Sequence, residues 1–188
     1  MSKIVTRDAG KWSEEGSFAA QPKTLYRLGK EKGRLEEALD SAQGLHNLFI
    51  VNGKDIWILN RVTKKGRHII DTDATHNFHA PLIPPIKPDE PPPLGDFEIG
   101  HEVAFMTDHQ VKPQTVQQEG KPVERYEYNQ DGYFLQVDVS PEKGVPVSVR
   151  VLKDKEEVVH LIYVEYVTGL PADPSLFAPP ADFKISEG

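Results

Sequence analysis

Two short apolar runs separated by a polar turn form the clearest pattern in the chain. Residues 48–51 (LFIV) and 56–59 (IWIL) flank the tetrapeptide Asn52-Gly53-Lys54-Asp55. Asn-Gly between runs rich in β-branched and aromatic residues is a strong hairpin signal, because both residues tolerate positive φ. The pattern therefore predicts an antiparallel hairpin over residues 45–60. Because both runs are nearly continuous in apolar residues, we expect both faces to be covered, or one face to line an apolar cavity.

The segments on either side of this hairpin predict more strands. Residues 25–28 and 34–39 are separated by a turn bracketed by Gly29 and Gly33, although residues 35–39 (LEEAL) also have high helix propensity. We favour two strands there. Residues 1–22 are polar and predict a short strand or a loose N-terminal arm. After the hairpin, a basic turn over residues 61–67 leads to a short strand at residues 68–71.

A proline-rich segment interrupts the strand pattern at residues 79–95. It contains seven of the sixteen prolines, together with the apolar residues Leu82, Ile83 and Ile86. Such a run favours polyproline II and is not compatible with a central strand or a helix interior. We interpret residues 79–95 as a crossing loop between two blocks of strands within a single domain, residues 1–188.

The second block is predicted to be β throughout. Candidate strands are residues 97–106, 123–129, 133–139, 145–152 and 158–167, with a hairpin turn at residues 130–132. In residues 133–139 every second side chain is apolar, so Tyr133, Leu135 and Val137 share one face. Near the end, Leu176 and Phe177 are expected to plug an edge or an end of the sheet.

Nine or ten strands joined by short turns indicate a mainly β fold with little helix. A single antiparallel sheet of that length must curl or close, so we predict a strongly curved antiparallel sheet, an incomplete β-barrel. Curling creates a concave face whose apolar residues need a cover or a ligand.

Composition narrows the classes of function. Hydrophobic residues are 38 % and charged residues 27 % of the chain, as in soluble globular proteins, and no apolar run approaches 18 residues. The net charge of −7 argues against nucleic acid as the main partner. Cysteine is absent, which removes disulfides, thiol catalysis and zinc–thiolate sites. The first ten residues have no apolar stretch of the signal-peptide type.

Several segments in order resemble one known family. GRLEEAL is followed by LFIVNGKDIWILN, a basic turn and HIID, and this order resembles the outer-membrane lipoprotein carrier family of the LolA and LolB type. The later segment ADPSLFAPPADFKI is similar to a closing Asp-x-x-Phe-x-x-Pro signature of uncharacterised relatives. The resemblance covers residues 23–71 and, more loosely, residues 97–185.

The resemblance implies a non-enzymatic, periplasmic carrier that holds acyl chains on the concave face of an incomplete barrel, without a cofactor. Its partners would be an apolar small molecule or a lipoprotein acyl chain, with transient contact to an envelope protein, and the chain would be a monomer. Arg34 matches the family's arginine that hydrogen-bonds the lid over the cavity. No amphipathic lid helix is evident, so the segment at residues 81–93 is expected to cover the cavity instead.

The candidate ligand contacts are the large apolar side chains of the predicted strands: Trp57, Phe49, Tyr133, Leu135, Val137, Val147, Val149 and Tyr163. A filled core in a structural envelope module is the alternative interpretation of the same residues. For Arg34 the alternative is a surface ion pair with Glu36 or Glu37.

An enzyme of another class is the second hypothesis. Imidazole and carboxylate groups that gather between residues 68 and 79 could serve a metal-dependent hydrolase, although their spacing matches no standard motif: His68, Asp71, Asp73, His76 and His79. Solvated loop residues are the simpler interpretation. There is no GxSxG motif for nucleophilic catalysis.

Overall fold

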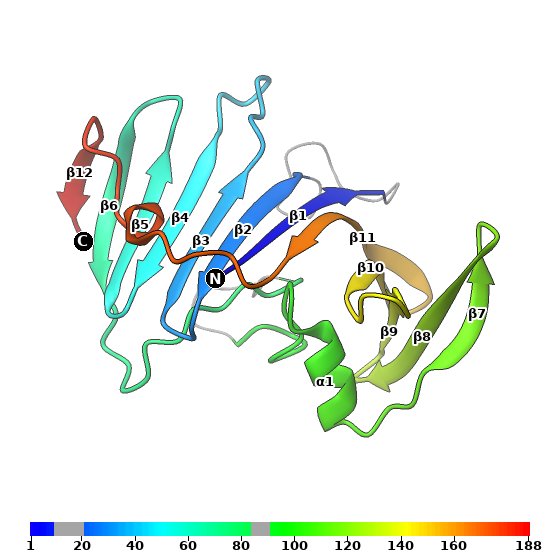
Figure 1. Ribbon diagram of the computed structural model, residues 1–188. Helices are drawn as coiled ribbons and strands as arrows, with labels where there is room; N and C mark the ends of the chain where they lie inside the picture. Colours follow the sequence, from blue (N-terminus) through cyan, green and yellow to red (C-terminus); the bar gives the residue numbers. More distant parts are fainter. Residues whose placement is uncertain (10–20, 84–90) are drawn as a thin grey trace. The chain divides into compact units, whose positions relative to one another are not determined.

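The computed structural model describes residues 1–9, 21–83 and 91–188, and its main feature is one twelve-stranded sheet (Figure 1). The strand order is β12-β6-β5-β4-β3-β2-β1-β11-β10-β9-β8-β7. The sheet is unclosed, since β12 and β7 lie at opposite ends of this order. The predicted fold class, a mainly β incomplete barrel with little helix, is confirmed. Among the described residues, no helix has the length and apolar character needed to cross a membrane.

The described chain divides into two compact units. Unit 1 takes residues 1–5, 21–79 and 165–188, and unit 2 takes the remaining described residues. The prediction of a single domain stays a prediction.

The strands, in chain order, are β1 (Ser2–Asp8), β2 (Lys23–Leu28), β3 (Lys32–Glu37), β4 (Asn47–Asn52), β5 (Asp55–Asn60), β6 (Lys65–Ile70), β7 (Gln114–Gln118), β8 (Lys121–Gln130), β9 (Tyr133–Val139), β10 (Pro146–Lys153), β11 (Glu156–Val167) and β12 (Lys184–Glu187).

Unit 1 contains the hairpin expected from the sequence. β4 and β5 pair antiparallel, with Asn52 opposite Asp55, so the loop consists of Gly53 and Lys54. Gly53 has a φ of +62°, the conformation required at the first central position of a type II′ turn. The hairpin is therefore confirmed, with its loop one residue later than the Asn-Gly pair. β2 and β3 also form a hairpin, so residues 35–37 extend as the favoured strand and not as the helix alternative.

The two faces of unit 1 differ in what covers them. A 3₁₀ helix, η1 (Pro174–Phe177), packs on β3 and β4, and Phe177 is fully buried against Leu48, Ile50 and Leu59. We call η1 the plug and this side of the sheet the plug face (Figure 1). Leu176 and Phe177 therefore cover a face of the sheet and do not plug an edge or an end of it.

Unit 2 contains β7 to β10 and residues 156–164 of β11, joined as antiparallel hairpins. The turn between β8 and β9 consists of Asp131 and Gly132, both with positive φ (51° and 82°), as the Asp-Gly sequence predicts for a type I′ turn. Register shifts occur in β10 between Pro146 and Ser148 against β9, and between Val151 and Leu152 against β11. Such irregularities bend a strand and increase its twist. β7 is a strand that is absent from the strands predicted above.

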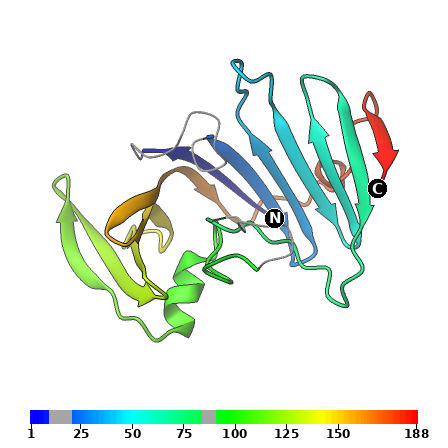
Figure 2. The same ribbon diagram turned by 180° about the vertical axis from the view of Figure 1, so that it is seen from behind.

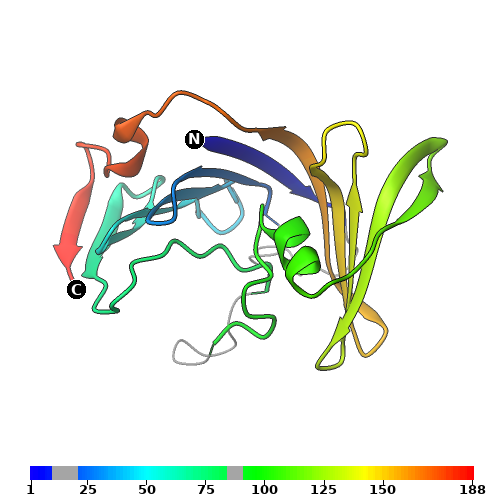
Figure 3. The same cartoon turned by 60° about the horizontal axis from the view of Figure 1, so that its bottom comes forward.

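The strand predicted over residues 97–106 is wrong, because a helix, α1 (Glu102–Asp108), occupies its second half. The buried residues of α1 are Glu102, Phe105 and Met106, which follow the i, i+3, i+4 spacing of one helix face. The Phe105 ring lies 5.9 Å from the Tyr128 ring of β8, and α1 contacts β9 (Figure 3). Tyr128 pairs with Leu135, so α1 covers the face of the sheet that carries Leu135.

Two further segments differ in detail from their predictions. Residues 2–8, interpreted as a short strand or part of a loose arm, form β1 between β2 and β11, with Ile4 buried. In the proline-rich crossing loop, Leu82 and Leu94 are each 2 % exposed, so its described parts are packed. Pro84, Pro85, Ile86 and Pro88 lie outside the described residues, as do residues 10–20 of the predicted arm.

Candidate functional site

Phe49 and Trp57, the two candidates in the central hairpin, lie on opposite faces of unit 1. Phe49 pairs with Ile58, whereas Trp57 pairs with Ile50. Paired residues share a face and neighbours in a strand alternate, so Trp57 belongs to the plug face and Phe49 to the other side. We call this other side the open face. The structure thus separates two residues that were predicted from the sequence to share one site.

The open face carries an apolar surface that crosses three strands. In one row Phe49 pairs with Ile58, and in the next Val51 pairs with Ile56, which pairs with Ile69. Ile58 is 41 % exposed and the other four are partly exposed. We call these five residues the apolar stripe. Within the described part of unit 1, no helix or strand covers the stripe, and Figure 2 shows this face with η1 on the far side of the sheet.

The apolar stripe has defined ends. On the β3 side, the Phe78 ring lies so close to Gly33 that a Cβ at Gly33 would overlap it, and the Arg27 guanidinium stands 4.9 Å over that ring. On the β6 side, Arg67 pairs with Ile58 and is exposed. The stripe therefore runs from a fixed aromatic ring to a cationic side chain.

The plug face is closed by packed side chains. Trp57 is partly buried against the cluster of Leu48, Ile50, Leu59 and Phe177, and its indole stacks on the His68 ring at 5.1 Å and 14°. Trp57 therefore has a packing role in this structure, as the filled-core interpretation of that residue expects.

Arg34 makes two polar contacts, one to the backbone of the plug and one to Glu36. Its Nη1 donates to the carbonyl oxygen of Leu176 at 3.3 Å, and its Nη2 is 2.9 Å from Glu36 Oε2. The first bond ties the plug to the sheet, and the second is the ion pair. Arg34 thus holds the plug, which carries the buried Phe177. Its expected role as the tether of a lid over the cavity stays a prediction.

Three basic side chains surround the Glu36 carboxylate beside the plug. In addition to Arg34, Arg61 Nη1 lies 2.6 Å and His46 Nε2 3.0 Å from Glu36 Oε1. Partial burial raises the pKa of the Glu36 carboxyl, but the hydrogen bond from Arg34 and the charges of Arg61, Arg34 and His46 together outweigh it. The pKa of Glu36 therefore lies below its ordinary value, and the carboxylate stays ionised.

Most of the candidates in unit 2 are fully packed. Leu135, Val137 and Val149 have no exposed surface, and Tyr133 is 7 % exposed, with its hydroxyl 3.1 Å from Lys153 Nζ. These residues form a filled core within the unit. The expectation that the same face shares a cavity with Trp57 concerns residues of both units and stays a prediction.

Val147 and Tyr163 have other surroundings. The register shift between Pro146 and Ser148 takes Val147 out of the alternation with Val149, and it lines a surface pocket of about 340 Å³ with Ser148 and Ile162. The hydroxyl of Tyr163 donates to the buried Glu102 carboxylate of α1, which also accepts the Gly100 N–H at 2.9 Å. Tyr163 therefore fixes α1 to β11 by a polar contact.

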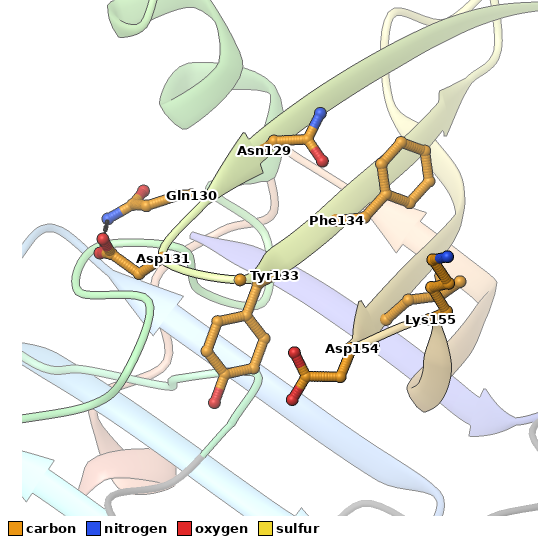
Figure 4. A pocket seen from close by; sticks show the side chains of 9 residues that line it. Asn129, Gln130, Asp131, Tyr133, Phe134, Asp154 and Lys155 are labelled. Atoms are coloured by element: carbon orange, nitrogen blue, oxygen red, sulfur yellow. Dashed lines mark hydrogen bonds between the residues drawn. The ribbon is translucent and has the colours of Figure 1, made fainter.

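A second surface pocket, of about 460 Å³, lies at the hairpin turns of β8–β9 and β10–β11 (Figure 4). Its lining includes Tyr133, Phe134, Asp154 and Lys155, and Figure 4 shows these side chains spread around the two turns. They do not converge on one point, so we assign the pocket no chemistry.

The histidine and carboxylate residues of the metal hypothesis are only partly brought together. His76 Nδ1 lies 3.3 Å from Asp71, whose carboxylate also accepts the Asp73 N–H. That backbone hydrogen bond, and then the bond to His76, lower the pKa of Asp71. The His68 ring is engaged by Asp55 and Glu187, so it is not directed toward Asp71. For His68, Asp71 and His76 these are ordinary loop and edge contacts.

A buried polar network in unit 2 was not predicted from the sequence. Asp138 is 1 % exposed and accepts two hydrogen bonds from Arg125, at 2.6 and 3.0 Å. It also accepts bonds from Gln136 and Ser148, each at 3.1 Å. The only hint in the sequence is that Gln136 and Asp138 alternate with the apolar residues of the predicted strand 133–139. That pattern is equally typical of a strand whose polar side faces solvent. With its carboxylate oxygens satisfied, Asp138 and its partners stabilise the sheet.

Comparison with known proteins supports the fold. No family model matches the chain, and no curated protein matches its sequence. An uncharacterized conserved protein from Thermus thermophilus has a similar structure, with a TM-score of 0.60 at 10 % identity over 100 % of this chain and 90 % of that one. MucB is more distantly similar. Alone it gives a TM-score of 0.48 at 12 % identity, and in the Pseudomonas aeruginosa MucA/MucB complex 0.47 at 13 %. This chain spans 57 % and 56 % of those two MucB chains.

Proposed function

We propose that this chain is a non-enzymatic binding protein that holds an acyl chain of a lipid or lipoprotein on the apolar stripe of unit 1. The observation that carries the proposal is the partial exposure of five apolar side chains from three adjacent strands, with Ile58 at 41 %. A contiguous apolar surface that remains uncovered on a folded protein commonly marks a binding site.

The spacing of the side chains in the stripe supports a hydrocarbon chain as the ligand. Its two rows of side chains are two residues apart along each strand, which is about 6.5–7 Å. An extended acyl chain lying between the rows crosses the strands and contacts both rows. Burial contributes about 0.8 kcal/mol per CH₂ group, so useful affinity needs no polar side chain.

Charge at one end of the stripe supports an amphipathic ligand. Arg67 pairs with Ile58 at the β6 end of the stripe, next to Ser186 of β12. A carboxylate or phosphate headgroup there would face a cation. An envelope location, transient contact with an envelope protein and a monomeric state accompany the carrier interpretation and are proposed with it.

The competing interpretation, a structural module with a filled core, fits other parts of the same molecule. Leu135 and Val137 are filled core in unit 2, and Phe177 fills the plug face in unit 1. The stripe is the feature that separates the two hypotheses, so it is the feature to test.

The test is binding of lauric acid or monomeric dodecylphosphocholine, followed by NMR shifts of the β4–β6 amides and by calorimetry. Ile58→Glu places a carboxylate in the middle of the stripe and should weaken binding at least tenfold, which is about 1.4 kcal/mol. Val62→Glu is the matched control, because Val62 is also an exposed apolar residue of unit 1 (51 %) and lies outside the stripe. Equal binding by both variants, or no binding by the unmodified chain, would refute the proposal. Native mass spectrometry of the purified protein would identify a retained lipid.

A further inference from the structure

The last described segment of the chain is fastened to unit 1 at the edge of the sheet. We call residues 171–188 the strap; it contains the plug and β12. β12 pairs in parallel with β6 over four residues, from Lys184 opposite Lys65 to Glu187 opposite His68. Lys184 N–H donates to the Lys64 carbonyl at 2.9 Å, and Gly188 N–H donates to the His68 carbonyl at 2.8 Å. So short a strand at an edge depends on its side-chain contacts.

Two polar side-chain contacts join β12 to its neighbours: Ser186 Oγ donates to the Gly66 carbonyl at 3.3 Å, and His68 contacts Glu187. The second involves a group that can be charged. His68 Nδ1 lies 2.9 Å from Glu187 Oε2 on β12, and its Nε2 lies 2.8 Å from Asp55 Oδ1 on β5. An ionised carboxylate only accepts hydrogen bonds, and a neutral imidazole donates from one nitrogen only. Both bonds therefore exist together only when the ring is an imidazolium.

The surroundings of the ring explain its preference for the charged form. The charged groups that face it are Asp55 from β5 and Glu187 from β12, while the neighbouring Arg67 points to the opposite face of β6. The hydrogen bonds to Asp55 and Glu187, in that order, raise the pKa of His68 above its ordinary value. The Trp57 indole stacks against the ring and holds its orientation.

We propose that His68 is a proton-controlled clasp that holds β12 against the edge of β6. With the imidazolium present, one cation joins three strands. When the ring loses a proton, one nitrogen becomes an acceptor that faces a carboxylate, and that contact turns repulsive. Of the two carboxylates Glu187 is the freer, with 81 % of its side chain exposed against 31 % for Asp55. β12 is therefore the strand that leaves.

The direction of the pH response follows from the raised pKa. The clasp is closed at pH values below about 6.5, where histidine is protonated with or without the contacts. It opens as the pH rises through the elevated pKa of the folded protein. We expect the opening to be local, because the burial of Phe177 and the 2.7 Å contact of Lys64 Nζ with Asp182 do not involve His68.

Amide hydrogen exchange on the full chain tests the clasp. Protection of the Lys184 and Gly188 amides, relative to an unstructured peptide at the same pH, should fall at least tenfold between pH 5.5 and pH 9, while the β2–β3 amides keep theirs. In His68→Gln the protection of both amides should be low at pH 5.5 and should not change with pH.

Two further variants complete the test. Glu187→Gln removes the acceptor-only partner and should reduce the pH dependence while β12 stays paired. His76→Gln is the control, because His76 contacts Asp71 and should leave the response unchanged. A pH-independent protection in the unmodified chain, or an undiminished response in His68→Gln, would overturn the proposal.

Discussion

Arg34 and Leu176, which are 142 residues apart in the sequence, are joined by a hydrogen bond of 3.3 Å from the guanidinium Nη1 to the backbone carbonyl oxygen. The Arg34 side chain is 11 % exposed, so little water is available to replace either partner. The bond fixes η1 over the cluster that contains Phe177. Loss of this bond should therefore lower the stability of unit 1 and leave the plug less well ordered.

Arg34→Ala should lower the free energy of unfolding by about 1.5–3 kcal/mol, because hydrogen bonds to charged groups contribute that much and a carbonyl is left unpaired. Urea unfolding measures the loss. Arg61→Ala is the control, since Arg61 shares Glu36 with Arg34 but does not contact Leu176. If the two variants are equally stable, the bond to Leu176 contributes nothing.

Acid should remove the contribution of Glu36. Its pKa is lower in the folded chain than in the unfolded chain, so the stabilisation is complete above about pH 4.5 and is lost as the pH falls through the folded pKa. The contribution is on the order of 1 kcal/mol, since the groups are partly screened by solvent. Urea midpoints for Glu36→Gln and the unmodified chain should differ at pH 7, and the difference should shrink as the pH is lowered through the folded pKa. A constant difference across that range would contradict the assignment.

Gly53→Val should destabilise the fold by about 1–3 kcal/mol through strain at positive φ. Nothing lies within 4 Å of an added Cβ at Gly53, so the effect would come from the backbone and not from a clash. Lys54→Val, at the other loop position, is the control and should cost less. An unchanged urea midpoint for Gly53→Val would show that the loop can adopt another turn type.

Lys155→Gly should stabilise the protein. Asp154 and Lys155 form the two-residue loop between β10 and β11, with φ values of 51° and 72°. A lysine in the left-handed region costs about 1–2 kcal/mol, and glycine removes that strain. Part of the gain is offset by the greater freedom of glycine in the unfolded chain, so we expect a net increase of roughly 0.5–1 kcal/mol. A lower thermal midpoint would contradict this expectation.

Features that depend on a few neighbouring residues were predictable from the sequence. The hairpin at residues 45–60 and the Asp131-Gly132 turn follow from local backbone preferences. The placement of Phe49 and Trp57 on opposite faces follows as well, once the loop is fixed at Gly53 and Lys54. With Asn52 opposite Asp55, counting three residues back along β4 and three forward along β5 places Phe49 opposite Ile58.

Features that depend on distant contacts were not predictable. The position of β1 between β2 and β11 is decided by pairing with strands far along the chain. In α1 the short apolar run fits a strand and a helix equally well, and packing of Phe105 on Tyr128 decides between them. The register shift at Val147 depends on how β10 pairs with β9. The alternation of apolar and polar residues along β10 alone carries no information about that pairing.

The parallel pairing of β12 with β6 also constrains the order in which the sheet is completed. His68 and Glu187 are 119 residues apart, so this contact closes a long loop and carries a high entropic cost early in folding. The edge of β6 is thus exposed in any folding intermediate that lacks β12. Lys65, Arg67 and His68 lie along that edge, and like charges on an exposed strand discourage pairing with another molecule. The basic residues of β6 would therefore reduce aggregation of a partly folded chain until β12 pairs with β6.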